Sequence, residues 1–303
     1  MTKHVAVLMG GWSAEREVSL VSGNAIVPAL AEKGFNVTGI DVDRDVAQTL
    51  SGLAPDVVFN ALHGRFGEDG TIQGLLEILG IPYTHSGVLA SAMAMDKPIA
   101  KRLFIDAGIR CPDGGLYSRD EVLAGTVIEP PFVVKPHNEG SSVGVRIVME
   151  GDNRPANDND WDYGETVLVE PYIPGREIQV AVMGDRALGA VEIRPKGRFY
   201  DYQAKYTDGF AEHVMPAPLP KADYEEAGRL ALLAHQTLGC RGVSRADLRY
   251  DDTGDGPAQF YLLEINTQPG MTPLSLVPEI AAHKGIGFAD LCAWMVEDAG
   301  CDR

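Results

Sequence analysis

Over the first ninety residues, short apolar runs alternate with segments of helical spacing. This order is typical of a parallel sheet covered by helices. Loops at the carboxyl edge of such a sheet commonly bind ligands, and the third run delivers the loop of residues 63–70 to that edge. The predicted strands cover residues 5–9, 37–42 and 56–62, and the predicted helices cover 19–33 and 71–79.

A second unit is predicted to begin near Val88. It contains a helix over 90–107 and an apolar strand over 132–135, followed by a loop rich in glycine and serine. Alternating apolar residues over 176–189 indicate antiparallel strands, and the irregular segment over 194–210 is long enough to suggest a functional loop. The remaining predictions are strands over 145–148 and 166–170, helices over 224–238 and 288–299, and three domains, 1–88, 89–173 and 174–303.

Composition excludes several classes of partner. The 303 residues carry a formal charge of −17 and a pI near 4.8, whereas nucleic acids and anionic membranes require a broad cationic face. No apolar stretch approaches the length needed to span a membrane, and the N-terminal run is too short for a signal peptide. The four cysteines, Cys111, Cys240, Cys292 and Cys301, are widely scattered and predict reduced thiols in a cytoplasmic protein.

A candidate metal site lies near the C-terminus. Glu264 and Asn266 are two apart in a predicted strand, so both side chains project from one face, while Leu263 and Ile265 are expected to point into the core. Asp247 also lies among apolar residues, between Val243 and Tyr250, and is expected on the neighbouring strand. Carboxylate and amide oxygens suit Mg²⁺ or Mn²⁺. A solvated strand face is the alternative interpretation of such a pattern.

Two lysines and a glycine loop suggest a site for phosphate groups. Lys135 ends an apolar strand, which places its charge in a cleft, whereas Lys97 by itself could be a solvated helix residue. Residues 140–144 do not match the Walker sequence, and Gly10-Gly11 does not match the dinucleotide-binding fingerprint. The glycine loop could cover phosphates, although an ordinary β-turn is the simpler interpretation.

Seven motifs occur in a fixed order along nearly the whole chain, at residues 8–19, 61–70, 95–97, 134–144, 199–206, 244–247 and 264–272. Together they resemble the ATP-grasp superfamily and, within it, the D-alanine–D-alanine ligases. The resemblance implies a three-domain α/β fold with an N-terminal, Rossmann-like parallel sheet and two α+β domains that sandwich ATP. It also implies a homodimer, because family members are commonly dimers.

The resemblance implies a set of nucleotide and metal contacts. Two magnesium or manganese ions would be held by Asp247, Glu264 and Asn266. ATP would be bound through its phosphates, base and ribose. The residues implied for ATP are Lys97, Lys135, Ser141, Ser142, Glu170, the backbone at Ile173, Glu177 and Lys205.

The resemblance also implies two subsites for D-alanine. Glu15 and His63 would contact the first substrate, and Arg245 with the Gly270 amide would face its carboxylate oxygens. Ser275 and Leu276 would receive the carboxylate of the second D-alanine. Ser141 and Tyr206 would reach from two loops toward Glu15. Without the resemblance, Glu15 could be a helix-dipole charge, His63 a turn residue and Tyr206 a packing aromatic.

The implied reaction joins two D-alanines to D-alanyl-D-alanine for peptidoglycan precursor synthesis. ATP first converts a carboxylate to an acyl phosphate, which an amine then attacks. One alternative is an ATP-grasp ligase for a different acid, which would lack Glu15, His63 and Ser275. A silent nucleotide-binding module, the second alternative, would lose Arg245 or a metal ligand. Tyr206 predicts an amine rather than a hydroxy acid as the nucleophile.

Overall fold

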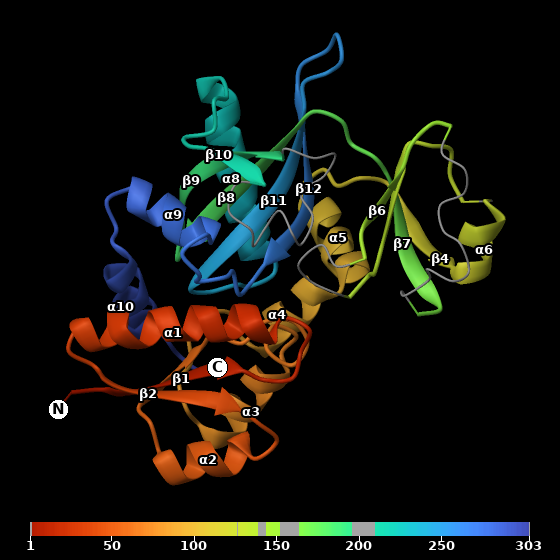
Figure 1. Ribbon diagram of the computed structural model, residues 1–303. Helices are drawn as coiled ribbons and strands as arrows, with labels where there is room; N and C mark the ends of the chain where they lie inside the picture. The colour runs from red at the N-terminus through yellow and green to blue at the C-terminus, as the bar shows by residue number, and fades with distance from the viewer. Residues whose placement is uncertain (1, 126, 139–143, 152–163, 196–209, 303) are drawn as a thin grey trace.

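The computed structural model describes residues 2–125, 127–138, 144–151, 164–195 and 210–302, and the described chain folds around three sheets. The N-terminal sheet lies below, the largest sheet above, and the third to the side (Figure 1). The mixed α/β architecture, with one parallel and two antiparallel sheets, confirms the predicted fold class.

The N-terminal sheet is parallel, with strand order β2-β1-β3. Its core strand β1 is almost completely buried, as expected of a parallel sheet covered on both faces. Helix α1 covers one face, and α2 and α3 lie on the other (Figure 1). Helix α2 was not predicted, because eight residues are too few to show a clear period. The elements are β1 (His4–Gly10), α1 (Arg16–Glu32), β2 (Asn36–Val42), α2 (Val46–Leu53), β3 (Val57–Asn60) and α3 (Thr71–Leu79).

The single helix predicted over 90–107 is wrong, because the structure divides it into α4 (Val88–Met95) and α5 (Lys97–Asp106). Asp96 leaves the helical conformation, and its side chain accepts a hydrogen bond from the Ile99 N–H. Pro98, in the first turn of α5, lacks an N–H and disfavours helix before it. The break brings the Lys97 N–H to the His137 carbonyl, 3.0 Å away.

The central unit is a four-stranded antiparallel sheet in the order β4-β7-β5-β6. Its small core includes Phe132, Val134 and Val169. Helix α6 begins with a capping box between Ser118 and Glu121. The elements are β4 (Gly115–Ser118), α6 (Arg119–Ala124), β5 (Phe132–Lys135), β6 (Arg146–Val148) and β7 (Thr166–Pro171).

The largest sheet has the order β10-β9-β8-β11-β12 and is antiparallel throughout. Helix α8 packs against its centre, as its contacts with β8, β9 and β11 show. The elements are β8 (Arg176–Met183), β9 (Arg186–Pro195), β10 (Ala211–Val214), α8 (Lys221–Thr237), β11 (Val243–Asp251), β12 (Gln259–Asn266), α9 (Leu276–His283) and α10 (Phe288–Asp298).

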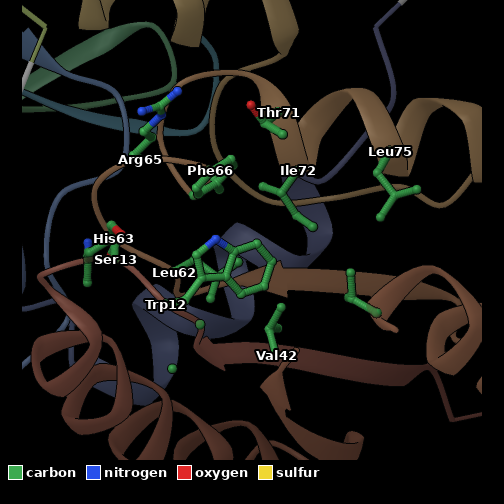
Figure 2. Close-up of a pocket in the computed structure, with 14 residues that line it drawn as sticks. Trp12, Ser13, Val42, Leu62, His63, Arg65, Phe66, Thr71, Ile72 and Leu75 are labelled. Atoms are coloured by element: carbon green, nitrogen blue, oxygen red, sulfur yellow. Dashed lines mark hydrogen bonds between the residues drawn. The ribbon is translucent and has the colours of Figure 1, made fainter. Parts of the chain in front are cut away.

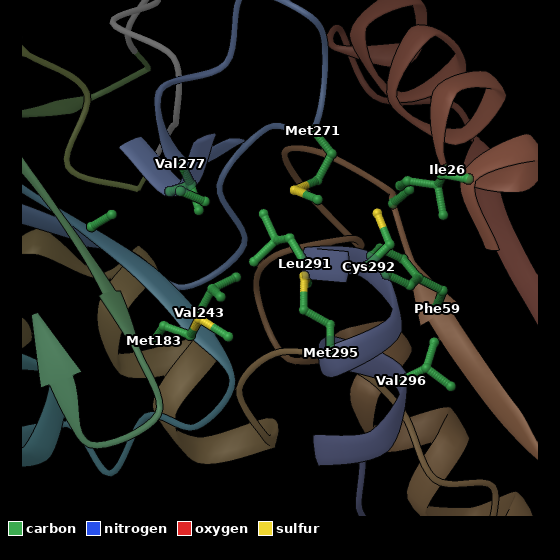
Figure 3. Close-up of a cluster of buried hydrophobic side chains, with 14 of the residues drawn as sticks. Ile26, Phe59, Met183, Val243, Met271, Val277, Leu291, Cys292, Met295 and Val296 are labelled. Carbon is green, nitrogen blue, oxygen red and sulfur yellow. The ribbon is translucent and has the colours of Figure 1, made fainter. Parts of the chain in front are cut away.

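The C-terminal helix α10 joins the N-terminal sheet to the largest sheet. Its Leu291 and Met295 are buried in one core cluster with Phe59 of β3 and with Met183 of β8. Figure 3 shows α10 between the two sets of side chains. The first and last parts of the chain therefore share one core, which was not expected from the sequence.

A β-bulge changes which leucine of β12 is buried. Asp247 pairs with Glu264, but the next residue of β11, Leu248, pairs with Leu262, so Leu263 is the extra residue. Leu262 is buried in the core and Leu263 is only partly buried, so the prediction that Leu263 points into the core is wrong. Ile265 is buried as predicted.

All four cysteines are free thiols, in agreement with the sequence prediction. None of the helices in the described ranges has both the length and the apolar composition required to cross a membrane.

Candidate active site

The polar face of β11 and β12, which we call the polar strand face, consists of Arg245, Asp247, Glu264 and Asn266. Asp247 is the register partner of Glu264, and Arg245 is the partner of Asn266. Residues paired in this way share one face of the sheet. Three of the four are the predicted oxygen ligands, so the structure brings those ligands together.

Each carboxylate of the polar strand face has a cationic partner. Arg245 donates two hydrogen bonds to Asp247, from Nε to Oδ1 at 2.7 Å and from Nη2 to Oδ2 at 2.9 Å. Lys97 Nζ lies 3.1 Å from Oε2 of Glu264. Asp247 is buried, so neutralising partners are required there. Lys97 links α5 to this face, which a sequence pattern could not indicate.

The chemistry of these side chains fits a hard divalent cation. The set offers two carboxylates and one amide oxygen, without sulfur or imidazole. Asn266 Oδ1 accepts a hydrogen bond from the Gln268 N–H at 2.8 Å, which fixes the direction of the amide oxygen. A carboxylate or amide oxygen has two lone pairs, so an oxygen that accepts one hydrogen bond can also bind a cation.

A second charged cluster lies between the central unit and α5. Glu170 of β7 is paired with Lys135 of β5, Nζ to Oε2 at 2.6 Å, and with Lys101 of α5. Burial acts to raise the pKa of Glu170, but the two ammonium groups outweigh it and leave the pKa below its ordinary value. Sequence reasoning missed Lys101, although its position one helical turn after Lys97 was a usable signal.

Glu177 and Gln179 of β8 continue the polar surface beside Asp247. Gln179 is the register partner of Asp247, and its Nε2 donates to Oε1 of Glu177 at 3.0 Å. Gln179 is 1% exposed, and its Oε1 has no hydrogen-bond partner among the described residues. The sequence analysis did not single out this glutamine.

The segment between β7 and β8 is held by Arg249. Its Nε donates to the Ile173 carbonyl at 3.0 Å and its Nη2 to the Gly175 carbonyl at 2.7 Å. Arg249 thereby fixes the backbone of Ile173 at the junction of the two antiparallel sheets, and the Ile173 carbonyl is already hydrogen-bonded.

His63 lies in the loop after β3, and both of its ring nitrogens have polar partners. Its Nδ1 is 3.0 Å from Oε1 of Glu68, and its Nε2 is 3.3 Å from Oγ of Ser22 on α1. The carbonyl of His63 accepts a hydrogen bond from Ser13 at 2.7 Å. Two neighbours thus fix the ring, and neither Glu68 nor Ser22 was predicted as a site residue.

Glu15, just before α1, is buried against the same loop. A Cβ at Gly64 would lie 2.5 Å from Oε2 of Glu15, and the φ of Gly64 is +67°. Glycine is therefore required at position 64 for both space and conformation. The structure brings Glu15 and His63 to the same loop, as predicted for one subsite.

The predicted residues of the loop after β12 also lie together. A Cβ at Gly270 would lie 2.8 Å from Ser275 Oγ, and Ser275 Oγ accepts the Thr272 N–H at 2.9 Å. Ser275 is the N-cap of α9 and makes no side-chain cap bond to that helix. The Leu276 side chain is buried in the core, so only its backbone N–H could contact a ligand.

Two family models match this chain. The family model described as D-ala D-ala ligase C-terminus matches residues 120–297, and the one described as D-ala D-ala ligase N-terminus matches residues 45–86. A protein of Chelativorans sp. named D-alanine–D-alanine ligase is 59% identical over 99% of both chains. The chain belongs to the D-alanine–D-alanine ligase family. It is therefore a ligase of the ATP-grasp fold.

Further relatives agree with this family assignment. The D-alanine–D-alanine ligase of Paramagnetospirillum magneticum is 59% identical over the whole of both chains. Two Bacillus anthracis crystal structures of D-alanine–D-alanine ligase cover 98% of this chain and 97% of their own. One, in complex with ATP, has a TM-score of 0.79 at 29% identity, and the other has 0.81 at 33%.

Within this ligase, an apolar pocket of about 110 Å³ adjoins the loop of His63. His63 and Ser13 lie at one end and Leu75 of α3 at the other, with Trp12 along the pocket (Figure 2). Trp12 and Phe66 are in ring contact, with centroids 5.3 Å apart. His63, one of the residues predicted for the first subsite, lines this pocket.

Four predicted site residues lie outside the described residues. They are Ser141, Ser142, Lys205 and Tyr206, and their roles stay predictions.

Proposed function

We propose that this chain joins two D-alanines to D-alanyl-D-alanine through an acyl phosphate, with conversion of ATP to ADP and phosphate. The product would serve peptidoglycan precursor synthesis in the cytoplasm, and the enzyme would act as a homodimer. Two observations support the proposal: the full-length similarity to D-alanine–D-alanine ligases, and the three oxygen ligands in register beside Arg245. The second is the observation on which the chemistry depends.

Asp247, Glu264 and Asn266 would hold two magnesium or manganese ions. When bound, these ions would neutralise the phosphate oxygens of ATP and orient its terminal phosphoryl group. Asp247 is paired with Arg245 and Glu264 with Lys97, so both carboxylates already have cationic partners. These pairs support the proposal that the polar strand face binds positive charge.

Lys97 and Lys135 would contact the nucleotide between the central unit and the largest sheet. Both are buried, which makes their charges stronger partners for phosphate than surface lysines would be. Glu170 with the Ile173 backbone would face the adenine, and Glu177 the ribose. Lys205 and the serines Ser141 and Ser142 would complete the phosphate contacts from two loops.

The first D-alanine would lie beside the loop of residues 63–70. Glu15 would bind its ammonium group, and His63 would line the subsite. The hydrogen bonds of His63 to Glu68 and Ser22 support a fixed ring, which saves the cost of ordering it when the substrate binds. Ser141 and Tyr206, in the two loops predicted at 137–144 and 197–210, would reach toward Glu15.

Arg245 and the Gly270 N–H would act in the second step. Attack of the second D-alanine's amine on the acyl phosphate builds negative charge on a tetrahedral oxygen. A preorganised donor at that oxygen is worth about 3 kcal/mol. The N–H of Leu276, at the start of α9, with Ser275 would bind the second substrate's carboxylate, since a helix N-terminus favours an anion.

Phosphate release from Mg·ATP, measured with each D- and L-amino acid in turn, tests the proposal. Release is expected with D-alanine and should match dipeptide formation. Preference for another acid would favour a different ATP-grasp ligase, and phosphate release with no amino acid dependence would contradict the proposal. D-lactate should be a poorer second substrate than D-alanine, and faster formation of D-alanyl-D-lactate at neutral pH would contradict the role of Tyr206.

A further inference from the structure

Two buried side-chain amides connect the N-terminal unit, which consists of the sheet β2-β1-β3 and its helices, to the loop after β12. Asn60, the last residue of β3, donates from Nδ2 to Oε1 of Gln268 at 2.7 Å. Gln268 donates from Nε2 to the carbonyl of Leu62, two residues after Asn60. Asn60 is 0% exposed and Gln268 is 1% exposed, so these bonds form out of contact with water.

The hydrogen bonds allow only one orientation of each amide. Nδ2 of Asn60 also donates to the Gly67 carbonyl at 3.0 Å, and Oδ1 of Asn60 accepts the Leu62 N–H at 3.2 Å. Rotating the Asn60 amide would place its oxygen against a carbonyl and its NH₂ against an N–H. Gln268 must then present its oxygen to Asn60 and its NH₂ to Leu62. Because each donor and acceptor of this buried pair has a required partner, the pair fixes the position of the backbone at Asn60 relative to the backbone at Gln268.

Each amide is attached to a different part of the proposed active site. On one side, Asn60 holds the Gly67 carbonyl within the loop that carries His63 and Glu68. On the other, the backbone N–H of Gln268 bonds to Oδ1 of Asn266 at 2.8 Å. The pair therefore connects the loop proposed for the first substrate to a proposed metal ligand by a short chain of hydrogen bonds.

We infer that Asn60 and Gln268 are positioning residues, which set the distance between the first D-alanine and the metal-bound terminal phosphate of ATP. The inference rests on the proposed function. Acyl phosphate formation requires the substrate carboxylate close to the phosphorus and in line with the leaving group. A displacement of about 1 Å can cost about 100-fold in rate. Neither side chain touches substrate; both act through the backbone and through Asn266.

The test replaces Gln268 by methionine, which has similar volume and no hydrogen bonds. Gln268→Met is expected to lower kcat for dipeptide formation about 10- to 100-fold, with the Kd for Mg·ADP, measured by calorimetry, within about twofold of wild type. Asn60→Leu should have the same effect, and the double variant should lose little more than either single variant, because both act on one connection.

Gln73 provides a matched control. It is also a buried glutamine, and its Nε2 donates to the same Gly67 carbonyl at 2.8 Å, but it lies on α3 within the N-terminal unit. Gln73→Met should lower the melting temperature to a similar extent and leave kcat within about twofold of wild type, because it makes no connection to Asn266. Equal losses of kcat in Gln73→Met and Gln268→Met would assign the effect to general destabilisation and overturn the inference.

A second measurement separates this inference from the proposed function. Hydrogen exchange of the 60–70 peptide should be faster in Gln268→Met, and hydrogen exchange of the 266–272 peptide should be faster in Asn60→Leu. In each variant the change is expected in the segment that lies on the other side of the Asn60–Gln268 contact from the substitution. Unchanged exchange in both peptides would overturn the inference even if the wild type makes D-alanyl-D-alanine. Absence of D-alanine turnover in the wild type would instead contradict the proposed function, and the exchange result would still decide the inference.

Discussion

The loop of residues 63–70 and the polar strand face hold similar polar groups but satisfy them in different ways. In the loop, His63 is enclosed by Glu68 and Ser22, so its polar atoms are paired within the protein. On the polar strand face, Asp247 and Glu264 are balanced by neighbouring cations, Arg245 and Lys97. The loop is therefore organised before a ligand binds, whereas a ligand could replace the charged partners on the polar strand face.

The largest expected effect tests whether the polar strand face requires both carboxylates. Glu264→Gln keeps the shape of the side chain but removes its charge, so metal and phosphate binding should fail. Turnover should fall about 1000-fold, equivalent to about 4 kcal/mol, with the protein still folded. Steady-state phosphate release and circular dichroism check this. Glu226→Gln, in an exposed pair with Arg229, is the control and should have unchanged turnover.

The second prediction concerns Glu170, whose charge is balanced entirely by lysines of the protein. Glu170→Gln would leave Lys101 and Lys135 buried beside a neutral side chain, and should lower the free energy of unfolding by about 3 kcal/mol at pH 7. Because the pKa of Glu170 is lowered in the folded state, Glu170 contributes fully to the free energy of unfolding at pH values above the ordinary pKa of a glutamate. This contribution is lost as the pH falls through the lowered pKa. Urea titrations should show the difference from wild type narrowing in acid. A constant difference down to the acid limit would contradict the ion-pair explanation.

The third prediction compares the polar strand face with the opposite face of the same sheet. Ser244, next to Arg245, points to that opposite face, where its Oγ lies 2.7 Å from Nδ1 of the buried His235. Burial lowers the pKa of His235 from 6.5 to about 4. Between these values the unfolded state binds the additional proton, so the free energy of unfolding should fall as pH decreases, by up to about 1.4 kcal/mol per pH unit.

His235→Gln should make this pH dependence shallower, as measured by urea unfolding at a series of pH values from about 6.5 to 4. The exposed His283 is the control, and His283→Gln should leave the slope unchanged. An equally steep slope in His235→Gln and wild type would assign the acid sensitivity to other groups.

The smallest expected effect tests whether the loop is organised by its own hydrogen bonds. Glu68→Gln keeps a polar partner for His63 Nδ1 but removes the charge, at a cost of about 1 kcal/mol, or roughly fivefold in kcat/KM for the first D-alanine. The KM for Mg·ATP should be unchanged. An equal rise in both KM values would indicate that the loop affects the whole site rather than one subsite.

Sequence alone predicted much of this site, because the relevant signals are local. Alternation along one strand predicted that Glu264 and Asn266 lie on one face, and the apolar residues around Asp247 predicted that it lies on the neighbouring strand. The register of the two strands confirms both predictions. The break at Asp96 could also have been read from Pro98 and the capping pattern. The bulge at Leu263 could not, because a bulge depends on how two strands pair.

Residue types and periodicity over a few residues were sufficient to predict the α/β class and the chemistry of the metal ligands, and seven short motifs were sufficient to indicate the family. Which distant groups meet depends on the tertiary structure. It placed Lys101 on Glu170, α10 between the two sheets, and Gln268 against Asn60. These contacts join residues far apart in the chain, and their formation depends on the packing of whole elements, which no local pattern encodes.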